Sequence, residues 1–238
     1  MAPPWWPPIV IPLLALLCVA VGEKAIAVTR PFAVVDAPSL AASFDIWDTY
    51  LPCDGVGTHG YVYDLHLYFS QNLFDYPDIE VQSQAVLDGF LAKTHAWHAC
   101  FRQVSMFSAG LTAEEDVYTN AAGGDSGPNA IGPNLQFAKM YQAYSSLSVG
   151  NYETFYLMEM DTLPRRNFWL DTLCALHASA MPYGVLGATY SGDKWRDFEP
   201  SLDQSLQLHI NGNAFYNPRH MLLVEMGELC TLKGEGIG

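Results

Sequence analysis

Basic side chains are scarce in this sequence. Its 238 residues include 11 lysines and arginines against 25 aspartates and glutamates, which gives a formal net charge of −14. Proteins that bind nucleic acid need a basic surface for the phosphates, so the composition argues against a nucleic-acid partner. The acidic balance suits a protein that binds divalent cations. Half of the residues are hydrophobic, enough for the core of one large domain or two small ones.

Charge is absent from the N-terminus, where no charged side chain precedes Glu23. The apolar run from Ile9 to Val21 has 13 residues, whereas a membrane-spanning helix needs about 20. The run therefore indicates a signal peptide, with Ala20-Val21-Gly22 as a small-residue cleavage motif. An uncleaved signal anchor remains the alternative if the preceding Pro/Trp stretch also enters the bilayer. Either form, over residues 1–22, directs the chain into the secretory pathway, to the ER or Golgi lumen or to secretion.

Cysteine pairs with metal-site spacing are also missing, because no Cys-x-x-Cys sequence occurs. After the leader there are four cysteines, which allow three ways of forming two disulfides. They are Cys53, Cys100, Cys174 and Cys230. We predict the pair Cys53–Cys100, since both lie near the ends of predicted strands.

Strand-like and helix-like segments alternate through the first two-thirds of the chain. This pattern predicts an α/β fold, a three-layer sandwich with a mostly parallel central sheet. Expected strands are 24–32, 61–70, 101–109, 153–161, 183–193 and 207–216, and expected helices are 36–50, 83–97, 134–147 and 166–180.

A long, polar, Gly-rich loop is expected over residues 110–134. The loop matches neither a phosphate-binding loop nor a dinucleotide fingerprint, which disfavours a P-loop enzyme and a nicotinamide dehydrogenase. Ligands of parallel sheets bind at the carboxyl ends of the strands. Those ends carry Thr29, Ser70, Asp161 and the beginning of this loop.

Two carboxylates, Glu159 and Asp161, end the hydrophobic strand expected over 153–161. At positions i and i+2 of a strand their side chains point to the same side. Such a pair suits Mg²⁺ or Mn²⁺, which take oxygen ligands and often bridge to phosphates. The alternatives are a solvated strand end or ion pairs with Arg165 and Arg166.

The segment "MEMDTLPRRNFWLDTL" resembles the motif of GT-A-type glycosyltransferases, the nucleotide-diphospho-sugar transferases. These have a hydrophobic strand, a D-x-D or E-x-D pair, and a Pro-containing link into a W-L-D-x-L helix. The matching residues are Glu159, Asp161, Pro164, Trp169, Leu170, Asp171 and Leu173. Further similar segments are "SFDIWDTYLPC", "GPNLQFAKMYQA", "GATYSGDKWRDFEPSL" and "LHINGNAFYN", in the family's order. The likeness implies a single GT-A (Rossmann-like) domain over 23–238, and leaves open whether its C-terminus is truncated.

The resemblance implies a transferase that moves a sugar from a nucleotide-diphosphate donor to a glycan or glycoprotein acceptor. Asp161 would ligate a divalent cation, Mn²⁺ or Mg²⁺, that bridges the diphosphate, and Glu159 would contact the metal, its water or the donor. Thr29 and Arg30 would lie near the nucleotide. Lys139 would reach phosphate, or be an ordinary solvated lysine.

Later segments supply the remaining candidates for the implied site. His209 is the candidate third metal ligand, with His220 as its competitor. Asp193 is the candidate catalytic base or acceptor contact, beside Asp197 and Glu199. Asn211-Gly212, flanked by apolar residues, otherwise predicts a hairpin turn.

Two other functions compete with the transferase. One is a non-catalytic carbohydrate-binding or scaffold protein on a decayed transferase fold. The other is a secreted hydrolase, but glycosidase carboxylates stand about 5 to 10 Å apart across the sugar, which fits one i, i+2 pair poorly.

Overall fold

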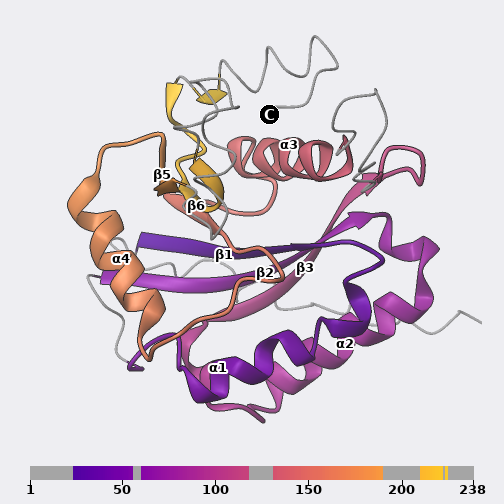
Figure 1. Ribbon diagram of the computed structural model, residues 1–238, viewed down its shortest axis with the longest axis horizontal. Coiled ribbons are helices and arrows are strands. Elements are labelled where there is room, and N and C mark those ends of the chain that lie inside the picture. Colours follow the sequence, from indigo (N-terminus) through magenta and orange to yellow (C-terminus); the bar gives the residue numbers. More distant parts are fainter. Residues whose placement is uncertain (1–23, 56–59, 118–130, 190–209, 222, 225–238) are drawn as a thin grey trace, which may run out of the picture.

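The central element is a six-stranded sheet with the strand order β3-β2-β1-β4-β6-β5 (Figure 1). The structure is a computed structural model and describes residues 24–55, 60–117, 131–189, 210–221 and 223–224. The strands are β1 (Lys24–Phe32), β2 (Tyr61–Gln71), β3 (Gln103–Leu111), β4 (Thr154–Leu157), β5 (Val185–Thr189) and β6 (Ile210–Tyr216). β1 to β4 are parallel, and β6 is antiparallel to both β4 and β5. The predicted α/β class with a mostly parallel sheet is confirmed.

Helices cover both faces of the sheet, with α3 on one side and α1 and α2 on the other (Figure 1). The α-helices are α1 (Asp45–Thr49), α2 (Pro77–Leu91), α3 (Ile131–Ser145) and α4 (Trp169–Ala180), and the short 3₁₀ turns are η1 (Ala37–Ser39), η2 (Ala42–Phe44), η4 (Leu73–Asp75) and η5 (Ala96–Cys100). The single helix expected over 36–50 is therefore divided into η1, η2 and α1. The helix expected over 83–97 ends at Leu91 and begins earlier, at Pro77, because proline is favoured in a first helical turn.

Alternation along β1 divides the core into two layers. Ile26, Val28 and Phe32 belong to the cluster that also holds Trp47. Ala27 belongs to the cluster beneath α3. Successive residues of β1 thus project to opposite faces, as a strand requires.

An aromatic cluster fills the layer on the α1 side. Trp47 is fully buried, and its ring centroid lies 4.8 Å from that of Phe44, 5.4 Å from Trp97, 5.8 Å from Phe101 and 5.3 Å from Trp169. The predicted disulfide Cys53–Cys100 is present beside this cluster. Cys174 is a buried free thiol, and Cys230 lies outside the described residues.

A chain of buried hydrogen bonds runs through the opposite layer. Arg102 donates to Asp64 through Nε at 3.0 Å and through Nη2, and Tyr152 donates to Asp64 at 2.8 Å. His66 joins the Tyr152 hydroxyl at 3.0 Å and the Tyr144 hydroxyl at 2.6 Å. Burial lowers the pKa of His66 to about 4, although Asp64 acts in the opposite direction. The imidazole is therefore neutral at neutral pH.

The leader predicted over 1–22 lies outside the described residues. Among the residues that the structure does describe, none of the helices is long and apolar enough to cross a membrane.

Candidate functional site

The Glu159–Asp161 pair lies just beyond the end of β4, beside the carboxyl end of β1. Leu157 pairs with Thr29, and the amide of Met158 donates to the carbonyl of Thr29 at 2.9 Å. β4 then stops. The expectation of a strand over 153–161 is wrong at its end, because Glu159 to Thr162 form a turn in which the Thr162 amide donates to the Glu159 carbonyl at 3.1 Å. The carboxylates therefore do not alternate along a strand.

Asn213 of β6 fixes this turn from one side. Its carboxamide oxygen accepts from the Glu159 amide at 3.0 Å and from the Thr162 hydroxyl at 2.6 Å. Its Nδ2 donates to Oε2 of Glu159 at 2.8 Å. Burial and the neighbouring Asp161 charge raise the pKa of Glu159, and the Asn213 hydrogen bond opposes them. Glu159 is thus an oriented, half-buried carboxylate.

Gly212 lies directly against the Glu159 carboxylate. A Cβ atom at residue 212 would be 2.3 Å from Oε1 and 2.7 Å from Cδ of Glu159. The predicted Asn211-Gly212 turn is wrong, because both residues lie within β6 (Ile210–Tyr216), at the point where its register with β5 shifts. Glycine is therefore required at residue 212 because a side chain would collide with the Glu159 carboxylate, and not because the chain turns there.

Replacing Gly212 by alanine should lower the free energy of unfolding by about 1–3 kcal/mol, because Glu159 must leave Asn213 and a half-buried polar pair is broken. Urea unfolding followed by circular dichroism measures the change. In a Glu159→Ala background, the added Gly212→Ala change should lower the free energy of unfolding much less than it does in the wild type, because the colliding carboxylate is gone. Additive losses in the two variants would contradict the proposed contact.

Asp161 is exposed, in contrast to Glu159. Among the residues described here, ion pairs join Lys24 to Glu153, His95 to Asp48 and Arg102 to Asp64. Neither Arg165 nor Arg166 forms an ion pair with Glu159 or Asp161 in that part of the chain; both arginines are exposed, and Arg166 donates to the Thr172 hydroxyl at 2.5 Å. The ion-paired alternative for the two acids is therefore wrong, and the approach to Asp161 is not blocked by these arginines.

Thr29 and Arg30 lie next to the turn but project into opposite core layers. The Thr29 hydroxyl is buried and shares a hydrogen bond of 2.5 Å with the Tyr144 hydroxyl. Arg30 is fully buried, and its Nη2 donates to the carbonyl of Met160 at 3.0 Å. A burial this complete was not expected from the sequence, where both residues resemble the polar end of a strand.

The other predicted site residues are more dispersed. Lys139 is exposed on α3. His220 packs beside Gly184, near the end of β6 that pairs with the beginning of β4. Asp161 follows the other end of β4, so the two residues lie at opposite ends of this strand. Asp193 and His209, with Asp197 and Glu199, lie outside the described residues. Within the described ranges there is no group of three or more His, Cys, Asp or Glu side chains that could hold a metal ion.

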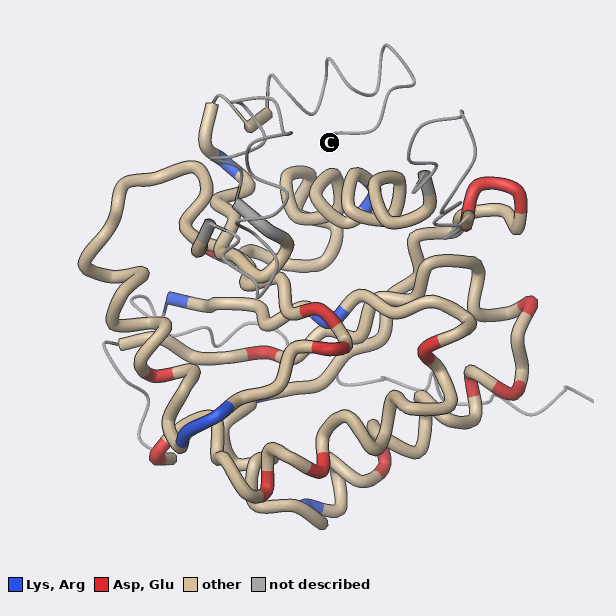
Figure 2. Tube along the Cα trace, viewed as in Figure 1, with Lys and Arg blue, Asp and Glu red and all other residues tan. Residues whose placement is uncertain are grey.

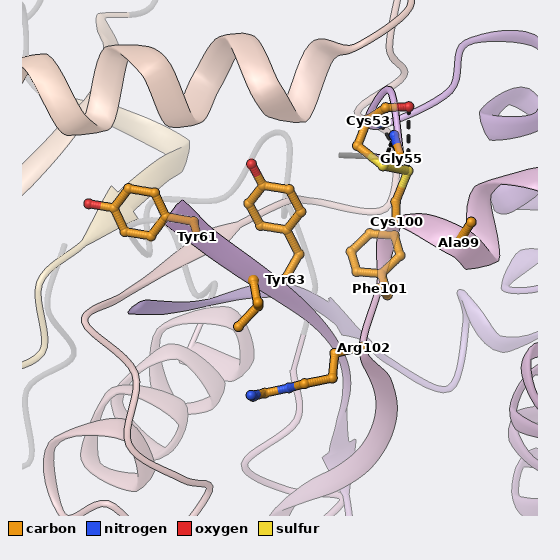
Figure 3. A pocket seen from close by; sticks show the side chains of 9 residues that line it. Cys53, Gly55, Tyr61, Tyr63, Ala99, Cys100, Phe101 and Arg102 are labelled. Carbon is orange, nitrogen blue, oxygen red and sulfur yellow. Dashed lines mark hydrogen bonds between the residues drawn. A yellow bond between two sulfur atoms is a disulfide. The ribbon is translucent and has the colours of Figure 1, made fainter. Parts of the chain in front are cut away.

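A hollow beside the disulfide lies at the opposite edge of the sheet, where β2 and β3 begin (Figure 3). Figure 3 shows Tyr61 and Tyr63 of β2 on one side of it, and Cys100 and Phe101 on the other. The hollow is therefore separate from the Asp161 turn.

Charge is unevenly spread over the described surface. Figure 2 shows acidic positions recurring along the helices on the α1–α2 side and few basic ones. An acidic surface repels free phosphate, so a phosphate-containing ligand would require local cations at its site.

Comparison with known proteins gives limited information. No protein-family model matches the sequence, and no curated protein matches it significantly. Among solved structures, the chain is similar to the apo form of mouse xyloside xylosyltransferase 1, with a TM-score of 0.47 and 11% sequence identity over 86% of this chain and 71% of that chain. A similarity of this size carries no information about activity, so the function rests on the residues of this chain.

Proposed function

We propose that this protein is a metal-dependent glycosyltransferase that moves a sugar from a nucleotide-diphosphate donor to a glycan or protein acceptor. The observation that supports this best is the Asp161 carboxylate, exposed and free of ion pairs within the described residues, in a fixed turn at the carboxyl edge of a parallel sheet. Ligands of open α/β sheets bind at this edge. The E-x-D sequence and the Trp169–Leu173 helix start also match the glycosyltransferase motif.

The residues of the turn fit a divalent cation. Carboxylate oxygens are the ligands that Mg²⁺ and Mn²⁺ prefer, and Asp161 offers them without a competing ion pair among the described residues. Asn213 holds Oε2 of Glu159, and no described residue donates a hydrogen bond to Oε1, so this oxygen can orient the metal's water or the sugar donor. When bound, the cation would stabilise negative charge on the departing nucleotide diphosphate.

The remaining assignments are part of the same proposal. Thr29 and Arg30 would lie near the nucleotide because they are at the carboxyl end of β1, although their side chains are buried. Lys139 is the candidate phosphate contact from α3. His209, which directly precedes β6 in the sequence, is the candidate third metal ligand. Asp193 is the candidate base on the acceptor side. The leader places the reaction in the secretory pathway, with membrane attachment if it is uncleaved.

Thermal unfolding with a panel of UDP- and GDP-sugars, each with and without Mn²⁺, tests the proposal. At about 100 times its dissociation constant a ligand stabilises the native state by about 2.7 kcal/mol, which raises the unfolding temperature of a domain this size by about 5–10 °C. We expect such a rise for at least one donor, and only when Mn²⁺ is present.

Asp161→Ala should abolish the metal-dependent rise. Asp88→Ala, which removes an exposed carboxylate from α2, is the matched control and should keep it. A panel without any metal-dependent shift would contradict the proposal and favour a non-catalytic carbohydrate-binding protein, which binding to immobilised glycans without a nucleotide would then reveal.

A further inference from the structure

Arg30 is an unusual residue for the interior of this fold. Its side chain is fully buried, and its Cζ atom lies 5.1 Å from the ring centroid of Phe44 and 5.5 Å from that of Trp47. Burying a guanidinium costs several kcal/mol even after relaxation. Each of the two contacts between the guanidinium and an aromatic ring stabilises the folded protein by only about 1–2 kcal/mol. Some other interaction must therefore account for a charged residue at this position.

Among the described residues, the hydrogen bonds of the Arg30 guanidinium lead to a single place. Nη2 donates to the carbonyl of Met160 at 3.0 Å and lies 3.5 Å from the carbonyl of Glu159. The same atom contacts the Met160 sulfur at 3.7 Å. Nε and Nη1 are buried, and neither has a hydrogen-bond partner in the part of the chain that the structure describes. Within the described ranges, all hydrogen bonds of the guanidinium are thus made with the segment Glu159–Met160 that follows β4.

The Met160 carbonyl needs a donor because β4 ends at Leu157. In a continuing strand a neighbouring strand would supply the donor. Within the turn the Glu159 carbonyl accepts from the Thr162 amide, and Arg30 donates to the Met160 carbonyl, while Asn213 binds the Glu159 amide and the Thr162 hydroxyl from β6. The turn is held by side chains from two separate strands.

Charge connects the same two elements. Burial lowers the pKa of Arg30 to about 10, and the Asp161 carboxylate opposes that decrease. Arg30 is therefore a cation at neutral pH. Its charge lies close enough to Asp161 to offset part of the repulsion between the two acids of the turn.

We propose that Arg30 is a positioning residue that fixes the Glu159–Thr162 turn through its main chain and so presents Asp161 for cation binding. The second half of this statement rests on the proposed function; the first does not. The stacked, buried guanidinium holds the turn before any ligand arrives, which lowers the ordering cost of binding. Arg30 contacts the main chain of the site and acts on the ligand through Asp161.

Hydrogen exchange measured by mass spectrometry tests the positioning role directly. In Arg30→Met, peptides containing the amides of Glu159 and Thr162 should exchange about tenfold faster, while peptides from β2 keep their wild-type rates. Arg30→Lys retains the charge but not the planar fork of donors, and it should show most of the same increase. Val86→Ala, a buried change on α2, destabilises the same core layer without contacting the turn. It should leave the ratio between the exchange rates of the turn peptides and the β2 peptides unchanged.

Cation binding is the second readout, measured by Mn²⁺ electron paramagnetic resonance titration. Arg30→Met should raise the apparent dissociation constant about tenfold or more, and Val86→Ala should not. Should Arg30→Met fail to fold, Arg30→Lys carries both measurements.

Turn amides that exchange like the wild type, or only in proportion to those of β2, would overturn the positioning role. Faster exchange with unchanged Mn²⁺ affinity would overturn its link to Asp161. A wild-type protein that binds no Mn²⁺ would overturn the proposed function and that link together, whereas the exchange rates would still decide whether Arg30 fixes the turn.

Discussion

Trp47→Ala should lower the free energy of unfolding by about 3–5 kcal/mol, the usual cost of removing a large aromatic side chain from a core. The side chain is fully buried among four other aromatic rings, and no described residue bonds to its indole N–H, so the loss comes from ring packing and from the contact with Arg30. Because domains are stable by only about 5–15 kcal/mol in total, this variant should be close to unfolding.

Guanidinium unfolding followed by tryptophan fluorescence and circular dichroism measures this effect. Trp47→Phe keeps a ring in the cavity and should cost less than half as much. Trp47→Ala also removes one of the two rings that contact Arg30. The amides of the Glu159–Thr162 turn should therefore exchange faster in this variant, even under conditions where the domain remains folded. A loss below about 1 kcal/mol would show that the cluster can close over the cavity.

Acid should destabilise the protein through His66. The folded-state pKa of this residue is about 4, whereas an unfolded chain binds the proton at about 6.5. A lowered pKa means that the folded state binds fewer protons than the unfolded state between these values. The stabilising contribution is therefore complete above pH 6.5 and is lost as the pH falls toward 4, by about 3 kcal/mol in all.

Urea unfolding at several pH values between 7 and 4 measures this slope. His66→Gln should be less stable than the wild type at pH 7, because the links to Tyr144 and Tyr152 are weakened, but its stability should fall less steeply with acid. Burial lowers the pKa of His98 and His177 as well, so a part of the slope should remain. Identical slopes in the two proteins would contradict the assignment to His66.

The parallel part of the sheet was predictable because it depends on local patterns. Residues 24–32 and 61–70 are rich in strand-forming side chains, and the helical segments between strands are long enough to cross over the sheet. The disulfide was predicted as one of three possible pairings, because both cysteines lie near the ends of expected strands. These features need little information beyond the segments themselves.

The end of β4 and the course of β6 were not predictable in the same way. β4 stops where distant side chains take over its main-chain hydrogen bonds, from Arg30 at a sequence separation of 130 and from Asn213 at a separation of 54. Asn-Gly predicts a turn from local preference, but tertiary contact with Glu159 decides the conformation of Gly212. The polar Asn213 in a strand with several apolar residues carried no local sign that it bonds to the turn after β4.

The reversed direction of β6 has a consequence for which parts of this edge can vary. β1 and β4 end at the edge where Glu159 and Asp161 lie, so their continuations are loops, whereas β6 begins there and holds Gly212 and Asn213 between two paired residues, Ile210 and Ala214. Loops accept substitutions and insertions more readily than paired strands do. Selection for a new ligand can therefore alter the exposed residues after Asp161 while positions 212 and 213 stay fixed, and a mutational scan should show high tolerance at Leu163, Arg165 and Arg166 and very low tolerance at these two positions.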